Sequence, residues 1–251
     1  MTTSAKTATT KTAPATPLLL PGQAASPAGP CDLSGMYLMH HAFRRDLRRF
    51  TAAVEHTPLD DATTWRALQE RWGRMAHHLH EHHSVEDRVL WPLLQERVDA
   101  AGDQTGQRVL DAMTAEHADI DPLLERAGDG FRTMADAPLR TVADDLAETL
   151  VEAFALLDGH LGHEERDAVA LVQRYVGADE WDRLERREFR GRPAIGELRF
   201  QLPWMVAGLP DDVVAPLVRA AGPAFRLLLV TSRRAFDKQE AAAFAHVPAT
   251  A

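Results

Sequence analysis

Apolar side chains recur every three or four residues along four long stretches of this sequence, which is the spacing that gathers them on one face of an α-helix. The first stretch carries Met36, Phe43, Leu47 and Phe50 in this pattern. No stretch alternates apolar and polar residues as a half-buried strand would. The sequence therefore predicts an all-α fold with four long helices, over residues 33–56, 61–98, 104–127 and 138–176.

Proline and glycine mark the expected ends of these helices. Pro58 should end the first helix, because the residue before a proline is disfavoured in the helical conformation. Gly102 should end the second and Gly128 to Gly130 the third. Pro92 falls inside the second helix, where we expect it to bend or restart the chain.

Two flanking regions differ from the central pattern. Residues 1–30 are rich in Thr, Ala and Pro and lack any periodicity, so we predict a disordered tail. After Gly177 the sequence predicts further helices over residues 181–189, 195–206, 211–221 and 223–244. The expected organisation is therefore a tail over 1–30, a four-helix bundle over 31–177 and a helical C-terminal extension over 178–251.

Composition narrows the class of protein. A formal net charge of −9 over 251 residues argues against nucleic acid as a partner, because phosphate binding needs a basic surface. Cys31 is the only cysteine, so no internal disulfide can form, as is usual in a reducing compartment. No apolar run is long enough to span a membrane, and Leu18 to Leu20 is too short for a signal peptide. We expect a cytoplasmic protein that binds no membrane.

Histidine lies on the predicted buried face of all four long helices. Two of these histidines are followed four residues later by glutamate, and residues at that spacing share one face of a helix. Burying His beside Glu among apolar side chains is costly unless the pair is hydrogen-bonded or binds metal. One such residue would be an ordinary core histidine, but the repetition predicts a dinuclear metal centre. Its candidate ligands are His40, His82, Glu86, His117, His160 and Glu164.

The types of ligand restrict the metal. Without a set of thiolates, a cysteine-rich zinc site and an iron–sulfur cluster are both excluded. Imidazole with carboxylate suits iron, manganese or zinc. Glu86 and Glu164 come from facing helices and could each bridge two metals, with the histidines as terminal ligands.

Several neighbouring residues remain alternatives. His78 lies on the same face as the second-helix pair and could be a ligand, a hydrogen-bond partner of a ligand or a pocket residue. His80 and His83 are predicted to point away, toward the surface. In a distorted fourth helix Glu165 could take the place of Glu164.

Residues 33–177 resemble the bacterial hemerythrin-like (HHE cation-binding) domains. The resemblance rests on the order and spacing of His40, His82-x-x-x-Glu86, His117 and His160-x-x-x-Glu164. It implies an up-down-up-down bundle that holds two non-haem iron ions. Their bridges would be carboxylates, with or without an oxo group. The implied small-molecule ligands are dioxygen, hydrogen peroxide and nitric oxide.

One position departs from the family pattern. Oxygen-carrying hemerythrins have a second histidine on the third helix, four residues after the first, and this chain has Asp121 there. Asp121 could ligate a metal, or the metal could keep an open position. Either alternative favours reaction with peroxide, including catalase-like turnover, over oxygen storage. A competing expectation is an iron- or oxygen-responsive sensor that signals through residues 178–251, and the oligomeric state is left open.

Overall fold

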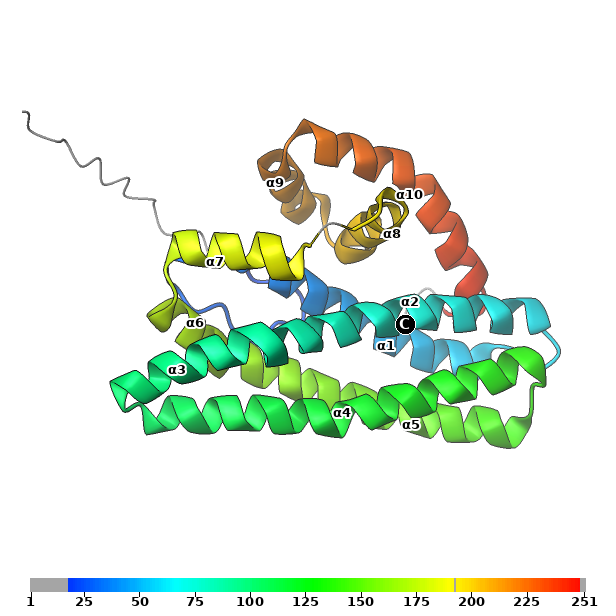
Figure 1. Ribbon diagram of the computed structural model, residues 1–251. Coiled ribbons are helices and arrows are strands. Elements are labelled where there is room, and N and C mark those ends of the chain that lie inside the picture. The colour runs from blue at the N-terminus through cyan, green and yellow to red at the C-terminus, as the bar shows by residue number, and fades with distance from the viewer. Residues whose placement is uncertain (1–17, 192, 249–251) are drawn as a thin grey trace, which may run out of the picture.

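The chain folds as a long antiparallel helical bundle with a second group of helices along one side (Figure 1). The computed structural model describes residues 18–191 and 193–248, and every regular element in these ranges is helical. The predicted all-α, up-down-up-down architecture is confirmed. The four rods of the bundle are α1 (Ser34–His56); α2 (Ala62–Val85) continued by η1 (Glu86–Leu90) and α3 (Trp91–Ala101); α4 (Gln104–Asp136); and α5 (Arg140–His163) continued by η2 (Glu164–Ala168) and α6 (Val169–Tyr175).

The second and fourth rods each contain one turn of π-helix, η1 and η2. A π-helical turn adds a residue, so the buried face shifts by one position beyond it. Val89 lies seven residues after His82, on the face that a continuous α-helix would bury, but it is only partly buried, whereas Leu90 is fully buried. Pro92 follows directly in the first turn of α3, where a proline is tolerated, and the rod continues through it.

The third rod is longer than predicted. Instead of ending at Gly128 to Gly130, α4 continues to Asp136. A Cβ atom on Gly128 would lie 3.3 Å from the indole nitrogen of Trp72, so this glycine allows close approach of α2 and α4. Phe131, just beyond, is fully buried and packs on the Trp72 ring at 5.1 Å between centroids. This burial offsets the loss of helix propensity, about 1 kcal/mol for a glycine relative to alanine.

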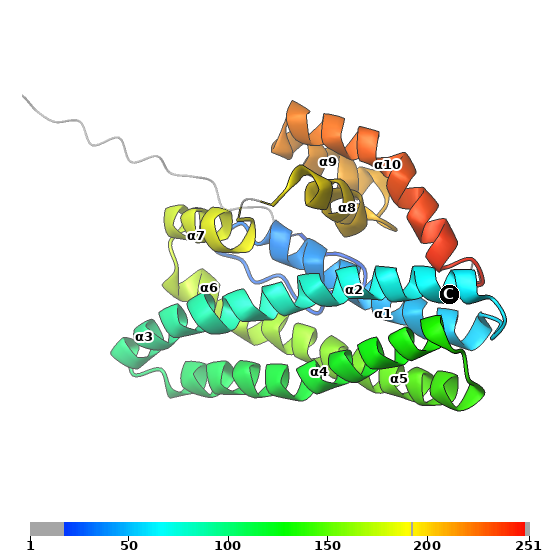
Figure 2. The same ribbon diagram turned by 45° about the vertical axis from the view of Figure 1, so that its right-hand side comes forward.

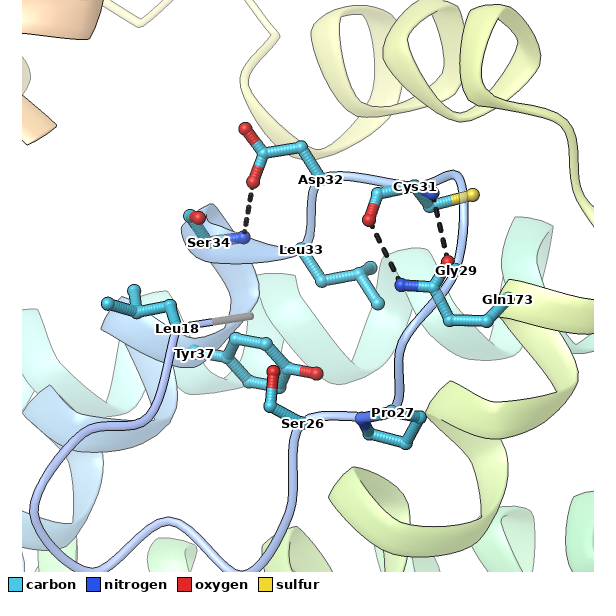
Figure 3. A pocket seen from close by; sticks show the side chains of 10 residues that line it. All are labelled: Leu18, Ser26, Pro27, Gly29, Cys31, Asp32, Leu33, Ser34, Tyr37 and Gln173. Carbon is cyan, nitrogen blue, oxygen red and sulfur yellow. Dashed lines mark hydrogen bonds between the residues drawn. The ribbon is translucent and has the colours of Figure 1, made fainter. Parts of the chain in front are cut away.

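Residues 18–30, predicted as part of a disordered tail, pack against the bundle (Figure 3). The side chain of Gln173 accepts a hydrogen bond from the Cys31 amide at 2.9 Å and donates one to the Cys31 carbonyl at 3.0 Å. A Cβ on Gly29 would lie 2.1 Å from the Gln173 carbonyl oxygen, so only glycine fits there. The prediction was wrong for this segment because its contacts are tertiary and leave no periodic signature. The same prediction for 1–17 lies outside the described residues.

The C-terminal helices cover the α1–α2 side of the bundle (Figure 2). Helix α8 packs on α1 and α10, and α10 returns to pack on α2. Trp204 is fully buried and belongs to the same apolar core as the bundle helices. Within the described ranges, none of the helices has the length and apolar character needed to cross a membrane. The helices of this C-terminal group are α7 (Ala178–Leu184), η3 (Glu185–Phe189), α8 (Ile195–Val206), α9 (Asp211–Ala221) and α10 (Pro223–Ala243).

A buried charge network joins these helices to the bundle. The fully buried Asp46 carboxylate accepts hydrogen bonds from Arg45, from Arg71 and, at 2.7 Å, from the Trp204 indole. Arg71 also donates to Glu240 of α10. Because isolated buried charges are costly, each member of this network depends on the others.

Candidate metal centre

Seven buried side chains meet in the middle of the bundle. Each is at most 5% exposed. The potential ligand atoms of His40, His82 and Glu164 lie within 4.8 Å of one another, and so do those of a second triad. The complete group is His40, His82, His83, Glu86, His117, His160 and Glu164. All six residues nominated from the sequence are in it, and His83 is additional.

The first triad brings imidazole nitrogens and a carboxylate close together. The Nε2 atoms of His40 and His82 are 3.2 Å apart. The Nε2 atom of His40 is also 3.2 Å from Oε2 of Glu164. Because these atoms come from α1, α2 and η2, the triad forms only when three rods of the bundle pack together.

The second triad consists of His83, His117 and His160. The Nε2 atoms of His117 and His160 are 3.1 Å apart. The ring of His83 stacks on that of His117, with 4.0 Å between centroids and an interplanar angle of 12°. This side of the centre therefore offers three imidazoles, from α2, α4 and α5.

Two glutamates face both triads. Glu86 Oε1 is 3.2 Å from Nε2 of His82, and its Oε2 is 3.6 Å from Nε2 of His117. Glu164 Oε2 is 3.2 Å from Nε2 of His40 and 3.9 Å from Nε2 of His160. A carboxylate that faces two groups of nitrogen donors is placed to bridge two cations.

Each of these glutamates is the first residue of a π-helical turn. The Glu86 amide donates to the carbonyls of His82 and His83, and the Glu164 amide donates to those of His160 and Leu161. The two His-x-x-x-Glu pairs thus share one local geometry on separate rods. Single π turns inside α-helices are frequent at functional sites.

Outer carboxylates orient three of the imidazoles through Nδ1. His117 Nδ1 lies 3.0 Å from Asp87, and His160 Nδ1 lies 2.8 Å from Glu116. His40 Nδ1 lies 3.0 Å from Glu165. A carboxylate on Nδ1 fixes the ring and leaves Nε2 as the donor for a metal, which is the usual arrangement around metal-bound histidine.

The alternative role of Glu165 as a replacement for Glu164 is not supported by the geometry. Glu165 is fully buried, but its carboxylate faces outward from the triads. It accepts hydrogen bonds from Arg44 at 2.6 Å and from the Ala24 amide at 2.7 Å, besides its contact with His40. The N-terminal segment and α1 therefore hold Glu165 as a support for His40.

The surroundings of Glu86 and Glu164 shift the pKa values of these two carboxyl groups in opposite directions. Burial, and then the nearby charge of Glu164, hold the pKa of Glu86 well above its usual value. Burial alone would also raise the pKa of Glu164, but His40 and then His82 lower it. Despite the opposing effect of burial, Glu164 and Glu165 raise the pKa of His40 to about 9.

The polar atoms of the centre are poorly satisfied by the protein alone. All four carboxylate oxygens of Glu86 and Glu164 are buried without a hydrogen bond, and so are both ring nitrogens of His83. A buried polar group left unsatisfied costs about 1–3 kcal/mol. Cations between the triads would satisfy these atoms, and a set of imidazole and carboxylate donors without thiolate fits iron, manganese or zinc.

The structure corrects the prediction for His83. This residue was expected at the surface but is only 2% exposed and belongs to the second triad. The signal that could have found it is its position directly after His82, because consecutive residues can both reach a wide buried face at the junction of three helices. His80 is exposed, as expected.

Two further alternatives are resolved by position. His78 is outside both triads: its ring stacks on Trp204 at 4.9 Å and its Nε2 atom pairs with Glu197 at 2.9 Å. The Asp121 side chain is 47% exposed and lies beside the second triad, with Oδ1 at 3.6 Å from His83 Nδ1. Neither His78 nor Asp121 therefore lies inside the cluster of seven side chains.

Comparison with known proteins identifies the family. The Hemerythrin HHE cation binding domain matches residues 32–172, which include all seven residues of the centre. Searches of curated proteins and of solved structures returned no match. The order of the histidines and glutamates, the antiparallel bundle and this match agree, and the chain belongs to the hemerythrin HHE cation-binding family.

Proposed function

We propose that this protein holds two non-haem iron ions between its triads and binds or reacts with a small oxidant: dioxygen, hydrogen peroxide or nitric oxide. The observation that carries the proposal is the position of Glu86 and Glu164, each of which faces imidazoles of both triads. Two bridging carboxylates with terminal histidines are a donor set for a pair of redox-active cations.

The enclosure of the centre favours small ligands. No ligand side chain is more than 5% exposed. Aromatic rings flank the cluster, with Phe43 at 5.7 Å and Phe189 at 6.1 Å from the His82 ring and Trp91 at 6.4 Å from the His117 ring. A substrate with its own side chains would require these rings to move, whereas a molecule of two to four atoms would not.

Bound iron would supply electrons and a Lewis-acid position for the oxidant. The protein's own contribution is to hold the imidazoles and to conduct protons. Glu116 accepts hydrogen bonds from Nδ1 of His160 and Nδ1 of His163, both at 2.8 Å. His163 is 27% exposed. Glu116 thus connects a candidate ligand with solvent and could carry protons that reduction of an oxidant consumes.

The expected preference for peroxide is no longer supported by the number of histidines. That preference depends on a site with four imidazoles, and His83 brings a fifth into the cluster. The side with His40 and His82 has fewer imidazoles than the other, so a metal there would keep an exchangeable position. The proposal therefore covers small oxidants as a class.

Rapid mixing tests the proposal. Protein loaded anaerobically with Fe(II) should change its near-ultraviolet and visible absorption on mixing with dioxygen, hydrogen peroxide or nitric oxide. Glu86→Met, which removes a bridging carboxylate, should lose this response, whereas Glu81→Met, an exposed position on the same rod, should keep it. Failure of the wild-type protein to bind Fe(II), or equal oxidation of Fe(II) with and without protein, would refute the proposal. A species stable for minutes would indicate a carrier, and repeated turnover of peroxide an enzyme.

A second candidate function is a sensor that signals through the C-terminal helices. The supporting observation is His78, which lies on α2 one turn before His82 and stacks on Trp204 of α8. Hydrogen–deuterium exchange of α8 to α10 should then differ between the metal-free and iron-loaded proteins. Identical exchange in both states would exclude this role.

A further inference from the structure

We propose that His83 is the fifth imidazole ligand of the metal centre and that Asp121 orients it. In this chain α2 would then provide a ligand that oxygen-carrying hemerythrins take from the third helix. The inference deepens the proposed function and rests on it, because it concerns how the same pair of cations is held.

The environment of His83 provides the first argument. The side chain is 2% exposed, and neither of its ring nitrogens has a hydrogen-bond partner. A buried histidine in an ordinary core would be expected to hydrogen-bond, since a lone buried polar group is costly. The donor capacity of His83 is unused by the protein itself.

The position of the ring provides the second argument. A ring nitrogen of His83 lies within 4.8 Å of the ligand atoms of His117 and His160. The His83 ring is nearly parallel to that of His117, and it is edge-on to that of His160 with 5.4 Å between the His83 and His160 centroids. Three ring nitrogens from three helices therefore lie close enough together for one metal ion to take them as ligands.

Asp121 provides the third argument. Its Oδ1 atom faces Nδ1 of His83 at 3.6 Å, too long for a hydrogen bond but on the correct side of the ring. His40, His117 and His160 each have a carboxylate at Nδ1 in the same way. A small rotation would give His83 the same support and leave its Nε2 atom as the donor. His83 on α2 and Asp121 on α4 would thus have exchanged the roles of ligand and neighbour.

A purely structural role for the His83 ring is the competing explanation. His83→Phe separates the two, because phenylalanine keeps the stack on His117 but has no nitrogen. We expect the metal-free variant to fold and melt cooperatively. With Fe(II) or Co(II) alone as the probe, it should bind about half the metal of the wild type, which itself should bind about two ions per chain. The Co(II) absorption spectrum of the variant should change, because the coordination of one ion changes. His80→Ala, an exposed histidine on the same helix, is the control and should bind metal as the wild type does.

Asp121→Asn tests the orienting role. Loss of a carboxylate that orients a ligand typically weakens metal binding about 10- to 100-fold, and here only one of the ions should be affected. Wild-type stoichiometry, affinity and Co(II) spectrum in His83→Phe would overturn the assignment of His83. An unchanged Asp121→Asn would overturn the role of Asp121. Wild-type protein that binds neither Fe(II) nor Co(II) would instead refute the proposed function itself, so the two failures are distinguishable.

Discussion

Replacing Glu86 by methionine should make the metal-free protein more stable. Methionine is unbranched and adaptable, so it can occupy the space of glutamate without a polar group. Glu86 is fully buried, neither of its oxygens has a hydrogen-bond partner within the protein, and its raised pKa indicates surroundings that disfavour its charge. The wild type should therefore carry a cost at this position that methionine removes.

The size of this effect follows from the unsatisfied carboxyl group. One such group costs about 1–3 kcal/mol. For a protein of this size, each kcal/mol shifts the melting temperature by about 2–4 °C. Metal-free Glu86→Met should thus melt about 2–12 °C above the metal-free wild type. Metal at one thousand times its dissociation constant would stabilise the wild type by about 4.1 kcal/mol, which exceeds the gain of the variant, and would leave the variant unchanged.

Differential scanning calorimetry of both proteins, with chelator and with Fe(II) under anaerobic conditions, checks the prediction. The order of the two melting temperatures should reverse between these conditions. Glu81→Met, an exposed control on the same rod, should shift stability by less than about 0.5 kcal/mol in both. If Glu86→Met melts well below the metal-free wild type, then Glu86 supports the bundle without metal, and the reasoning from its unsatisfied oxygens is wrong.

Three further predictions concern the contact between the bundle and the C-terminal helices. Asp46→Ala should lower the free energy of unfolding by about 3–5 kcal/mol, because it leaves Arg71 buried without its partner. The control Asp144→Ala, at an exposed ion pair, should lower it by at most about 1 kcal/mol, and chemical unfolding measures both. Arg71 and then Arg45 overcome the effect of burial and lower the pKa of Asp46 to about 2. Its contribution to stability should therefore be complete above the unfolded pKa of about 3.9 and lost as the pH falls from there toward 2, which circular dichroism can follow and Asp46→Asn should abolish. Truncation after Gly177 removes the fully buried Trp204 from the shared core, so we expect the truncated chain to lose its cooperative thermal unfolding. A truncated chain that unfolds cooperatively and binds metal would show that the C-terminal helices form an independent module.

The apolar periodicity and the histidine spacing were sufficient to predict the bundle and most of its centre. His40, His82, His117 and His160 lie where a straight helical stripe places them, because burial at every third or fourth residue is a local property of each helix. The place of Glu164 beside both triads also followed from its spacing. These features depend on one helix at a time, and a single sequence contains them.

Features that depend on contacts between helices could not be predicted in this way. The π turns at Glu86 and Glu164 shift the buried face by one residue, and nothing in the composition of those turns marks them. Similarly, α4 continues through Gly128 because Trp72 of another helix packs against it. His83 was missed because a stripe one residue wide excludes the neighbour of His82, whereas the junction of α2, α4 and α5 accommodates both rings.

Metal content measured together with the optical spectrum tests the central claim most directly. Protein expressed in iron-replete medium and purified without chelator should contain about two irons per chain. Its absorption should be that of a bridged ferric pair, and both should be lost in Glu86→Met. One zinc per chain without iron, or no bound metal at all, would contradict the claim that Glu86 and Glu164 bridge a pair of iron ions.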